Sequence, residues 1–313
     1  MANPAASLPA VVAGLLKKHT SGPDTFPELR LSPPMTQNGE NGTFQILNTP
    51  LRYDKMRSNA AAASWDGLRG VQRLQYATVS TQLRPYESDA VVMTSRQLAA
   101  LEGQNPDLAV LDTARQLIVE SLRGVIADAI MAEMSAFSSG GTIDTTTTSY
   151  NLAGDLSAAC DTIQIATGMR PNLLAVDRQA VSNLTALNDN VRAYAGAAVG
   201  GGSVIALSLA SEATLRSYVG DMGLELVVMD RSYIAASGTA GFQWTGNAFL
   251  GYCSGGTTPS ALKTLSPDAD VVRIDSGEIS ILEGGPGVAL VARSQIDCVV
   301  PDSDLGLTFT VTY

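Results

Sequence analysis

The clearest pattern of apolar and polar positions lies between residues 106 and 137. Apolar side chains recur there every three or four residues, which is the period of one face of an α-helix. Asn105 suits the N-cap, Pro106 the first helical position, and Asp107 the positive end of the helix dipole. The pattern predicts a helix of about 30 residues and roughly 45 Å. Its predicted apolar face consists of Leu111, Ala114, Ile118, Leu122, Val125, Ala129 and Ala132, broadened by Leu108, Leu117, Ile130, Met134 and Phe137.

A polar stretch, SSGGTIDTTTTSY at 138–150, follows this helix, and its Gly, Ser and Thr content predicts a loop or a domain boundary. Beyond it, helical and strand-like patterns alternate, which favours α/β packing. Gly168 ends the first predicted helix, and Asp177 can cap the second. The predicted segments are helices around 156–163, 177–187 and 211–219, strands at 172–176, 224–229 and 248–253, and a flexible loop at 195–203.

Short strand patterns fill the chain from residue 261 to the end. Alternating apolar positions at Leu307, Phe309 and Val311 predict a half-buried strand that can return to pack on the long helix. Turns are predicted at Gly277 and around Pro286. The predicted strands span 271–275, 278–282, 288–292 and 307–313.

The first 90 residues form two unusual segments. Six prolines interrupt residues 1–37, which predicts an extended arm that needs another surface to lie on. Strand-like runs at 43–52 and 71–83 predict a two-stranded ribbon, which is marginal by itself in water.

Charge changes the interpretation of this ribbon. The whole chain of 313 residues carries a formal charge of −10, whereas residues 51–84 hold six basic and two acidic side chains. This local charge of +4 leaves −14 for the rest, so we expect the ribbon to lie on an acidic neighbour, such as another copy of the chain. A solvated hairpin with chance charge is the alternative. The basic residues are Arg52, Lys55, Arg57, Arg69, Arg73 and Arg84.

Composition excludes several classes of protein. A 45% hydrophobic and 16% charged chain is neither disordered nor collagen-like. Its acidic balance argues against a protein whose main task is to grip nucleic-acid phosphates. No run of about 20 apolar residues predicts a membrane span, and the short apolar stretch at 8–16 lacks the polarity of a secretory signal.

Candidate chemistry is sparse. Cys160, Cys253 and Cys298 show neither metal nor disulfide spacing, so we expect buried thiols in a reducing cell, and His19 is the only histidine. The glycine runs at 200–202 and 284–287 lack phosphate-binding and dinucleotide-binding motifs. Acidic residues around 268–275 lack calcium-loop spacing. Glu120, Asp128 and Glu133 fit an exposed helix face. These patterns predict no enzyme, no cofactor and no metal site.

The order of these segments, together with four stretches of sequence, resembles the major capsid protein of tailed bacteriophages, which has the Hong Kong 97-type fold. The resemblance implies an α+β chain with an N-terminal arm, an extended E-loop, a peripheral domain with a spine helix, and an axial domain. The similar stretches are RPNLLAVDRQAVSNLTALNDNV, LASEATLRSYVGDMGLELVVMDRSYI, NAFLGY and SQIDCVVPDSDLGLTFTVTY. The implied boundaries are the arm at 1–37, the E-loop at 38–90, the peripheral domain at 91–150 and 261–313 with the spine helix at 106–137, and the axial domain at 151–260.

The resemblance also implies a function. Copies would form hexamers and pentamers of an icosahedral phage head around double-stranded DNA, assembled in the host cytoplasm and found in the virion. Implied partners are the chain itself, portal and scaffolding proteins, and a decoration protein. DNA contact would be weak and non-specific, through Lys17, Lys18 and Arg30 of the arm. No membrane is implied.

The sequence departs from the family pattern in two ways, and three alternative functions remain open. No helical scaffolding segment of roughly a hundred residues precedes the arm, so we expect scaffold to be separate or already removed. Some members cross-link an E-loop Lys to a peripheral Asn, but Lys55 is the only E-loop lysine and residues 248–313 contain no Asn, so we do not expect that reaction. The rivals are an encapsulin-like nanocompartment shell around a cargo enzyme, a tail or baseplate protein, and an α/β enzyme with an unrecognised site.

Overall fold

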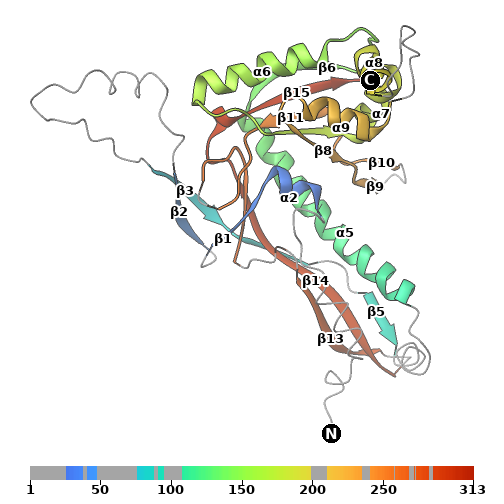
Figure 1. The fold of residues 1–313 in the computed structure, drawn as a ribbon. Coiled ribbons are helices and arrows are strands. Elements are labelled where there is room, and N and C mark those ends of the chain that lie inside the picture. Colours follow the sequence, from blue (N-terminus) through green and yellow to red (C-terminus); the bar gives the residue numbers. More distant parts are fainter. Residues whose placement is uncertain are drawn as a thin grey trace, which may run out of the picture.

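The computed structural model describes residues 26–37, 41–47, 76–87, 91–94, 108–198, 210–234, 240–256, 258–267, 271, 273–281 and 285–313. Two sheets dominate these residues, and a long helix, α5 (Leu108–Glu133), runs from one to the other (Figure 1). One sheet has five strands in the order β6-β15-β11-β7-β8. The other follows the path β1-β12-β14-β13, with β4 and β5 also paired to β14. This arrangement confirms an α+β architecture.

The predicted α/β unit forms as the local signals indicate. Asn151 caps α6 (Leu152–Thr167) through its side chain, and Gly168 ends that helix with a φ of 79°, a conformation that favours glycine. Asp177 caps α7 (Arg178–Leu187), as expected. Ser211 and Thr214 form a capping box at the start of α9 (Glu212–Gly220). The part of the predicted loop at 195–198 instead belongs to a helix, α8 (Asp189–Ala198), and residues 199–203 lie outside the described residues.

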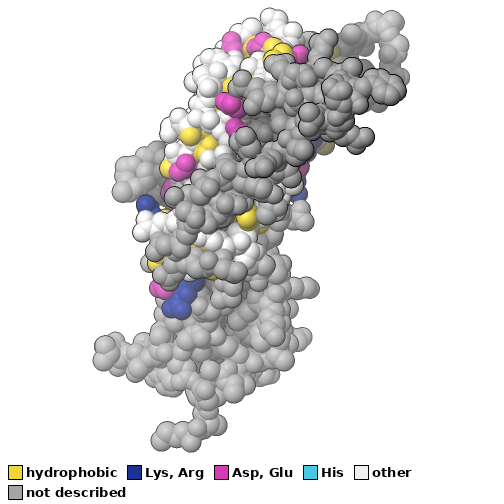
Figure 2. Space-filling view, turned by 90° about the vertical axis from the view of Figure 1, so that its left-hand side faces the viewer, with side chains coloured by type: hydrophobic (Ala, Val, Ile, Leu, Met, Phe, Trp, Pro, Cys, Tyr) yellow, Lys and Arg dark blue, Asp and Glu magenta, His cyan; other side chains and the backbone are white. Residues whose placement is uncertain are grey.

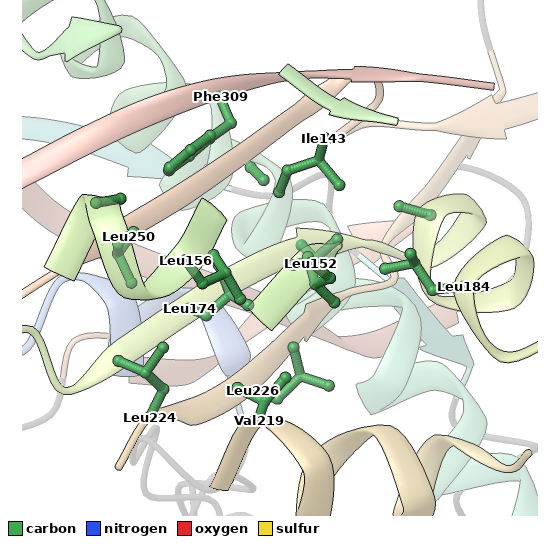
Figure 3. Packing of buried hydrophobic residues seen from close by; sticks show 14 of the residues in the cluster. Ile143, Leu152, Leu156, Leu174, Leu184, Val219, Leu224, Leu226, Leu250 and Phe309 are labelled. Carbon is green, nitrogen blue, oxygen red and sulfur yellow. The ribbon is translucent and has the colours of Figure 1, made fainter. Parts of the chain in front are cut away.

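The five-stranded sheet is covered on both faces. Strands β7 (Leu173–Asp177) and β8 (Glu225–Met229) are parallel, and β11 (Asn247–Gly251) runs antiparallel to β7 and to β15 (Gly306–Thr312). On one face, Leu156 of α6, Leu184 of α7 and Val219 of α9 pack into a cluster with apolar side chains of the strands (Figure 3). On the other face, Leu122 and Ile126 of α5 pack with alternate strand residues. This alternation between two cores explains why β7 is buried along its whole length.

The predicted polar loop at 138–150 is partly wrong. Residues Ser138–Asp144 form a strand, β6, which pairs in parallel with β15 at the edge of the sheet. Composition pointed to a loop because Gly140 and Gly141 interrupt the strand pattern. A Cβ at Gly140 would lie 2.5 Å from the Phe309 ring, so a small residue is required where β6 crosses that ring.

The spine helix exists, but its buried face differs from the predicted one. Over the part whose side chains the structure describes, Leu122, Ile126 and Ile130 are buried, while Val125 and Ala129 are only partly buried and Ala132 is exposed. The predicted apolar face was therefore rotated by about one residue from the face that is buried. The small alanines caused this shift, because they fit the helical period whether or not they are buried. Leu111, Ala114 and Ile118 lie on the helix, but their side chains are outside the described residues. A short 3₁₀ turn, Met134–Ala136, follows the helix.

The C-terminal strands are longer than predicted. The runs at 271–275 and 278–282 merge into β13 (Arg273–Ile281), and the predicted turn at Gly277 is wrong because Gly277 pairs with Ala289 inside the ladder. Strand β14 (Gly285–Val299) is a single strand of 15 residues that packs along α5. The strand at 307–313, which was predicted to return to the long helix, instead forms β15 and pairs with β11 and β6. Gly285 and Pro286, where a second turn was predicted, belong to β14 and pair with Ile281 and Ser280, and residues 282–284 lie outside the described residues.

The described part of the arm lies against the body, whereas the ribbon contacts the body at its base. Residues Pro27–Leu31 form a short helix, α2, followed by β1 (Pro34–Thr36), which pairs with β12 (Lys263–Ser266). The ribbon is present as β2 (Asn41–Leu47) and β3 (Tyr76–Gln82) in antiparallel register, and residues 48–75 are outside the described range. Short strands β4 (Arg84–Glu87) and β5 (Val91–Thr94) then pair with β14, and β9 (Ser232–Ile234) pairs with β10 (Ala240–Phe242).

Candidate assembly surfaces and the arm–spine junction

The predicted basic surface of the ribbon lies mostly beyond the described residues. Arg52, Lys55, Arg57, Arg69 and Arg73 all lie in that segment, outside the described residues. Arg84 is described. It is exposed on β4, opposite Ile296 of β14, and it forms no ion pair with any described residue.

The root of the ribbon is fixed to the body. The Thr81 hydroxyl donates to Gln37 Oε1 at 2.9 Å, and the Gln82 backbone N–H donates to Asp297 Oδ2 at 3.0 Å. Leu83 is buried against Leu265 and Val299. The ribbon therefore leaves the body from a packed, hydrogen-bonded base, which fixes the direction in which it projects.

An ion cluster that sequence reasoning missed joins the arm to the spine helix. Arg123 of α5 donates from Nε to both carboxylate oxygens of Glu28, at 3.0 and 2.9 Å, and from Nη2 to Asp230 Oδ1 at 2.8 Å. Glu120 Oε1 lies 3.4 Å from Arg123 Nη1. We call these four residues the arm–spine junction. It links α2, α5 and the end of β8, three segments that are far apart in sequence.

Burial sets the electrostatics of the junction. Only 11% of the Arg123 side chain and 1% of the Glu28 side chain are exposed. Burial raises the pKa of Glu28 above its usual range, although the hydrogen bonds and charge of Arg123 oppose that rise. Burial lowers the pKa of Arg123, but Glu28 and Asp230 more than offset this, so the pKa lies above its ordinary value. The sequence signal that could have pointed to this junction is Arg123 itself, a charged residue next to the apolar stripe of the spine helix.

A second set of contacts joins the same helix to Arg231 and Gln243, which lie near the β9–β10 pair. The Arg231 guanidinium donates from Nη2 and Nε to the backbone carbonyl of Glu120, at 3.0 and 3.2 Å, and from Nη1 to Gln243. Gln243 Nε2 donates to the Gly124 carbonyl at 2.9 Å and also contacts Asp128. A Cβ on Gly124 would lie 2.3 Å from Arg231 Nη2, so the glycine lets the guanidinium reach the helix backbone.

The three cysteine thiols and the lysine amine of the described residues belong to buried side chains. Cys160, Cys253 and Cys298 are free and buried, as expected, and burial raises the pKa of each thiol, to about 12 for Cys298. Lys263 is also buried, donates to the Gly256 carbonyl, and has its pKa lowered by burial to about 8. The described residues hold no group of three or more potential metal ligands. None of the described helices is long and apolar enough to cross a membrane.

The described surface is acidic in character and carries few large apolar side chains. On the face shown in Figure 2, Asp and Glu side chains are spread over the upper part, while Lys and Arg occupy a few places lower down. Ile165 on α6 is the most exposed large hydrophobic of the described residues, at 83%. Such a surface suits polar contacts with a basic segment better than broad hydrophobic association.

Comparison with known proteins places this architecture. No protein-family model matches the sequence, and no curated protein matches it. A phage-related protein from Bordetella bronchiseptica RB50 superimposes with a TM-score of 0.63 over 96% of both chains, at 13% identity. The capsid of cyanophage P-SCSP1u gives a TM-score of 0.53 over 94% of this chain and 89% of the other, at 14% identity. A virus-like particle from Pyrococcus furiosus gives 0.51 over 96% of both chains, at 12% identity. The chain therefore has the α+β Hong Kong 97-type fold that these structures share.

Proposed function

We propose that this chain is the major capsid protein of a tailed phage, and that its copies form the hexamers and pentamers of an icosahedral head around double-stranded DNA. The observation that carries the proposal is the nearly full-length likeness in fold to a phage-related protein and to a cyanophage capsid. The acidic balance of the chain agrees with a container wall that does not hold its genome tightly.

Repeated weak contacts supply the mechanism. One exposed ion pair contributes only about 0–1 kcal/mol, but a closed shell repeats each contact many times, so assembly becomes cooperative. In this proposal, the basic ribbon of one subunit lies on acidic surfaces of its neighbours. Arg52, Lys55, Arg57, Arg69, Arg73 and Arg84 provide the cations, because guanidinium groups bind carboxylates with defined geometry.

The packed base of the ribbon supports this mechanism. Gln37 and Asp297 hold the end of β3, so the projection keeps a fixed direction when it meets a neighbour. The arm–spine junction does the same for the N-terminal arm by fixing Glu28 to the spine helix. The proposed partners beyond the chain itself are portal, scaffolding and decoration proteins, with assembly in the host cytoplasm and the finished shell in the virion.

Electron microscopy of the purified recombinant chain tests the proposal. We expect closed shells, or hexamers and pentamers that close when scaffold is supplied. A stable, monodisperse monomer under all assembly conditions would contradict it. Rings or tubes would instead support a tail or baseplate role.

An encapsulin-like nanocompartment shell is the second candidate. The likeness to the Pyrococcus furiosus virus-like particle covers both chains as fully as the phage matches do. Particles isolated from the native source distinguish the two functions. Double-stranded DNA inside them supports the phage head, and an enclosed enzyme without DNA supports the nanocompartment.

A further inference from the structure

The described end of the arm, residues 26–37, runs from the spine helix to the root of the ribbon (Figure 1). We call this segment the strap. Helix α2 forms its first half and β1 its second. All of its residues except Thr36 are buried or partly buried, so the strap packs against the body along its length.

The first half of the strap is fixed to the spine helix and to the five-stranded sheet. Leu29 and Leu31 are fully buried in the apolar core that contains the buried face of α5. Glu28 accepts from Arg123 Nε through both carboxylate oxygens, and α2 also packs beside β8. Release of α2 would therefore expose apolar side chains and break a buried ion pair.

The second half is fixed to the other sheet and to the ribbon. The Ser32 hydroxyl lies 3.5 Å from the Cys298 thiol of β14, and β1 pairs in parallel with β12. At the end of the strap, the Gln37 backbone N–H donates to the Ser266 carbonyl at 2.8 Å. Gln37 Oε1 accepts the Thr81 hydroxyl of β3 at 2.9 Å. The strap thus reaches both sheets, the spine helix and the ribbon within 12 residues.

Neither half of the strap is long enough to keep its structure alone. Helix α2 has five residues and β1 has three, whereas isolated helices shorter than about 12 residues are marginal in water. Each half therefore depends on its packing against the body. Because two residues, Ser32 and Pro33, separate the halves, loss of packing at α2 leaves β1 held mainly by a three-residue ladder. We expect the strap to pack and release as one unit.

We propose that the strap couples the core around the spine helix to the root of the ribbon. When the strap is packed, Gln37 holds Thr81; when it is released, the root keeps its direct contacts with β14 and β12 but loses this one. Coupling is reciprocal, so a ribbon held by a neighbour would in turn favour the packed strap. The coupling belongs to the single subunit, and its use during assembly rests on the proposed shell function.

Hydrogen exchange measured by mass spectrometry on free, full-length subunits tests the coupling. Leu29→Ala weakens the packing of the strap, and Leu156→Ala makes the same truncation of a buried leucine in the other core. The central strand β11 reports global unfolding in both variants. Relative to β11, we expect the amides of β3 to exchange about tenfold faster in Leu29→Ala than in Leu156→Ala.

The outcomes separate this inference from the proposed function. Equal exchange of β3 in the two variants, relative to β11, overturns the coupling and leaves the shell function standing. Absence of shells overturns the shell function and leaves the coupling standing, because the coupling is measured on free subunits.

A reversible lock tests the same coupling without weakening the core. Ser32→Cys places a second thiol beside Cys298, and oxidation with diamide should join the two as a disulfide. We expect exchange of β3 to slow by about threefold on oxidation and to recover on reduction. Wild-type chain treated with diamide is the control. Unchanged exchange after the disulfide has formed contradicts the coupling. Failure of the disulfide to form also contradicts it, because residue 32 then does not lie beside Cys298 in solution.

Reciprocity supplies the third measurement. Thr81→Val removes the hydroxyl that Gln37 accepts, whereas Thr81→Ser keeps a hydroxyl at the same position. We expect the amides of α2 to exchange about threefold faster in Thr81→Val and at the wild-type rate in Thr81→Ser. Equal exchange of α2 in the two variants would show that the ribbon root does not act on the strap.

Discussion

Arg123 is the residue on which the arm–spine junction depends. Its guanidinium is shared by Glu28 and Asp230, and a buried carboxylate that loses its cation is left with an unpaired charge. We expect Arg123→Met to lower the free energy of unfolding by about 3–5 kcal/mol, measured by urea denaturation. The double variant Arg123→Met with Glu28→Leu removes both charges and should recover most of the loss. A single-variant effect below about 1 kcal/mol would show that the pair is not buried in solution.

Lys263 gives the stability a specific pH dependence. Its pKa in the folded chain, about 8, lies below the ordinary 10.5, so between these values the unfolded chain binds more protons than the folded one. The free energy of unfolding should therefore rise with pH across that window by about 3 kcal/mol relative to Lys263→Met, which has no proton to lose. Urea denaturation of both proteins at several pH values between about 8 and 10 measures this difference. Parallel pH profiles would contradict the burial of a charged Lys263.

In the spine helix, one glycine should not follow the usual rule of helix propensity. Alanine in place of glycine usually stabilises a helix by about 0.5–1 kcal/mol. At Gly124, however, the new methyl group would displace the Arg231 guanidinium from the Glu120 carbonyl. We expect Gly124→Ala to destabilise the chain in thermal melts. The matched control is Gly220→Ala at the end of α9, where a Cβ meets no atom within 4 Å, and this variant should be stabilising. Equal gains from both substitutions would contradict the docking of Arg231.

The ribbon is the element on which assembly should depend most. Reversing Arg57 and Arg84 to Glu replaces two cations that we propose meet acidic neighbours, so shell yield should fall while subunit stability stays the same. Arg84 is exposed, so its reversal does not disturb the core. Replacing both with Lys keeps the charge but loses the bidentate geometry and should give an intermediate yield. Sedimentation and electron microscopy measure the yield, and a normal yield from the Glu variant at ordinary salt would contradict the proposed contact.

Across the whole molecule, the sequence predicted correctly those features that depend on residues close together in the chain. Asp177 and Gly168 delimit helices through contacts within a few residues, so their roles were predictable. It failed where the partner is distant. Strand β6 is a strand only because β15, more than 160 residues later, pairs with it, and Glu28 is buried only because Arg123 lies opposite. The order of segments revealed the fold, whereas the arm–spine junction depends on pairings between distant residues that no local pattern encodes.

The charge of the whole molecule leads to a final prediction about DNA. A chain with a formal charge of −10 repels phosphates except where cations are concentrated, and of the arm cations proposed for DNA contact, Arg30 already binds Glu225. Lys17 and Lys18 then remain, so filter binding of free subunits to duplex DNA should be weak, with a slope of log affinity against log salt of about −2. Lys17→Glu with Lys18→Glu should abolish retention at low salt. A slope of about −6 or steeper would require many phosphate contacts and would contradict a wall that holds its genome loosely.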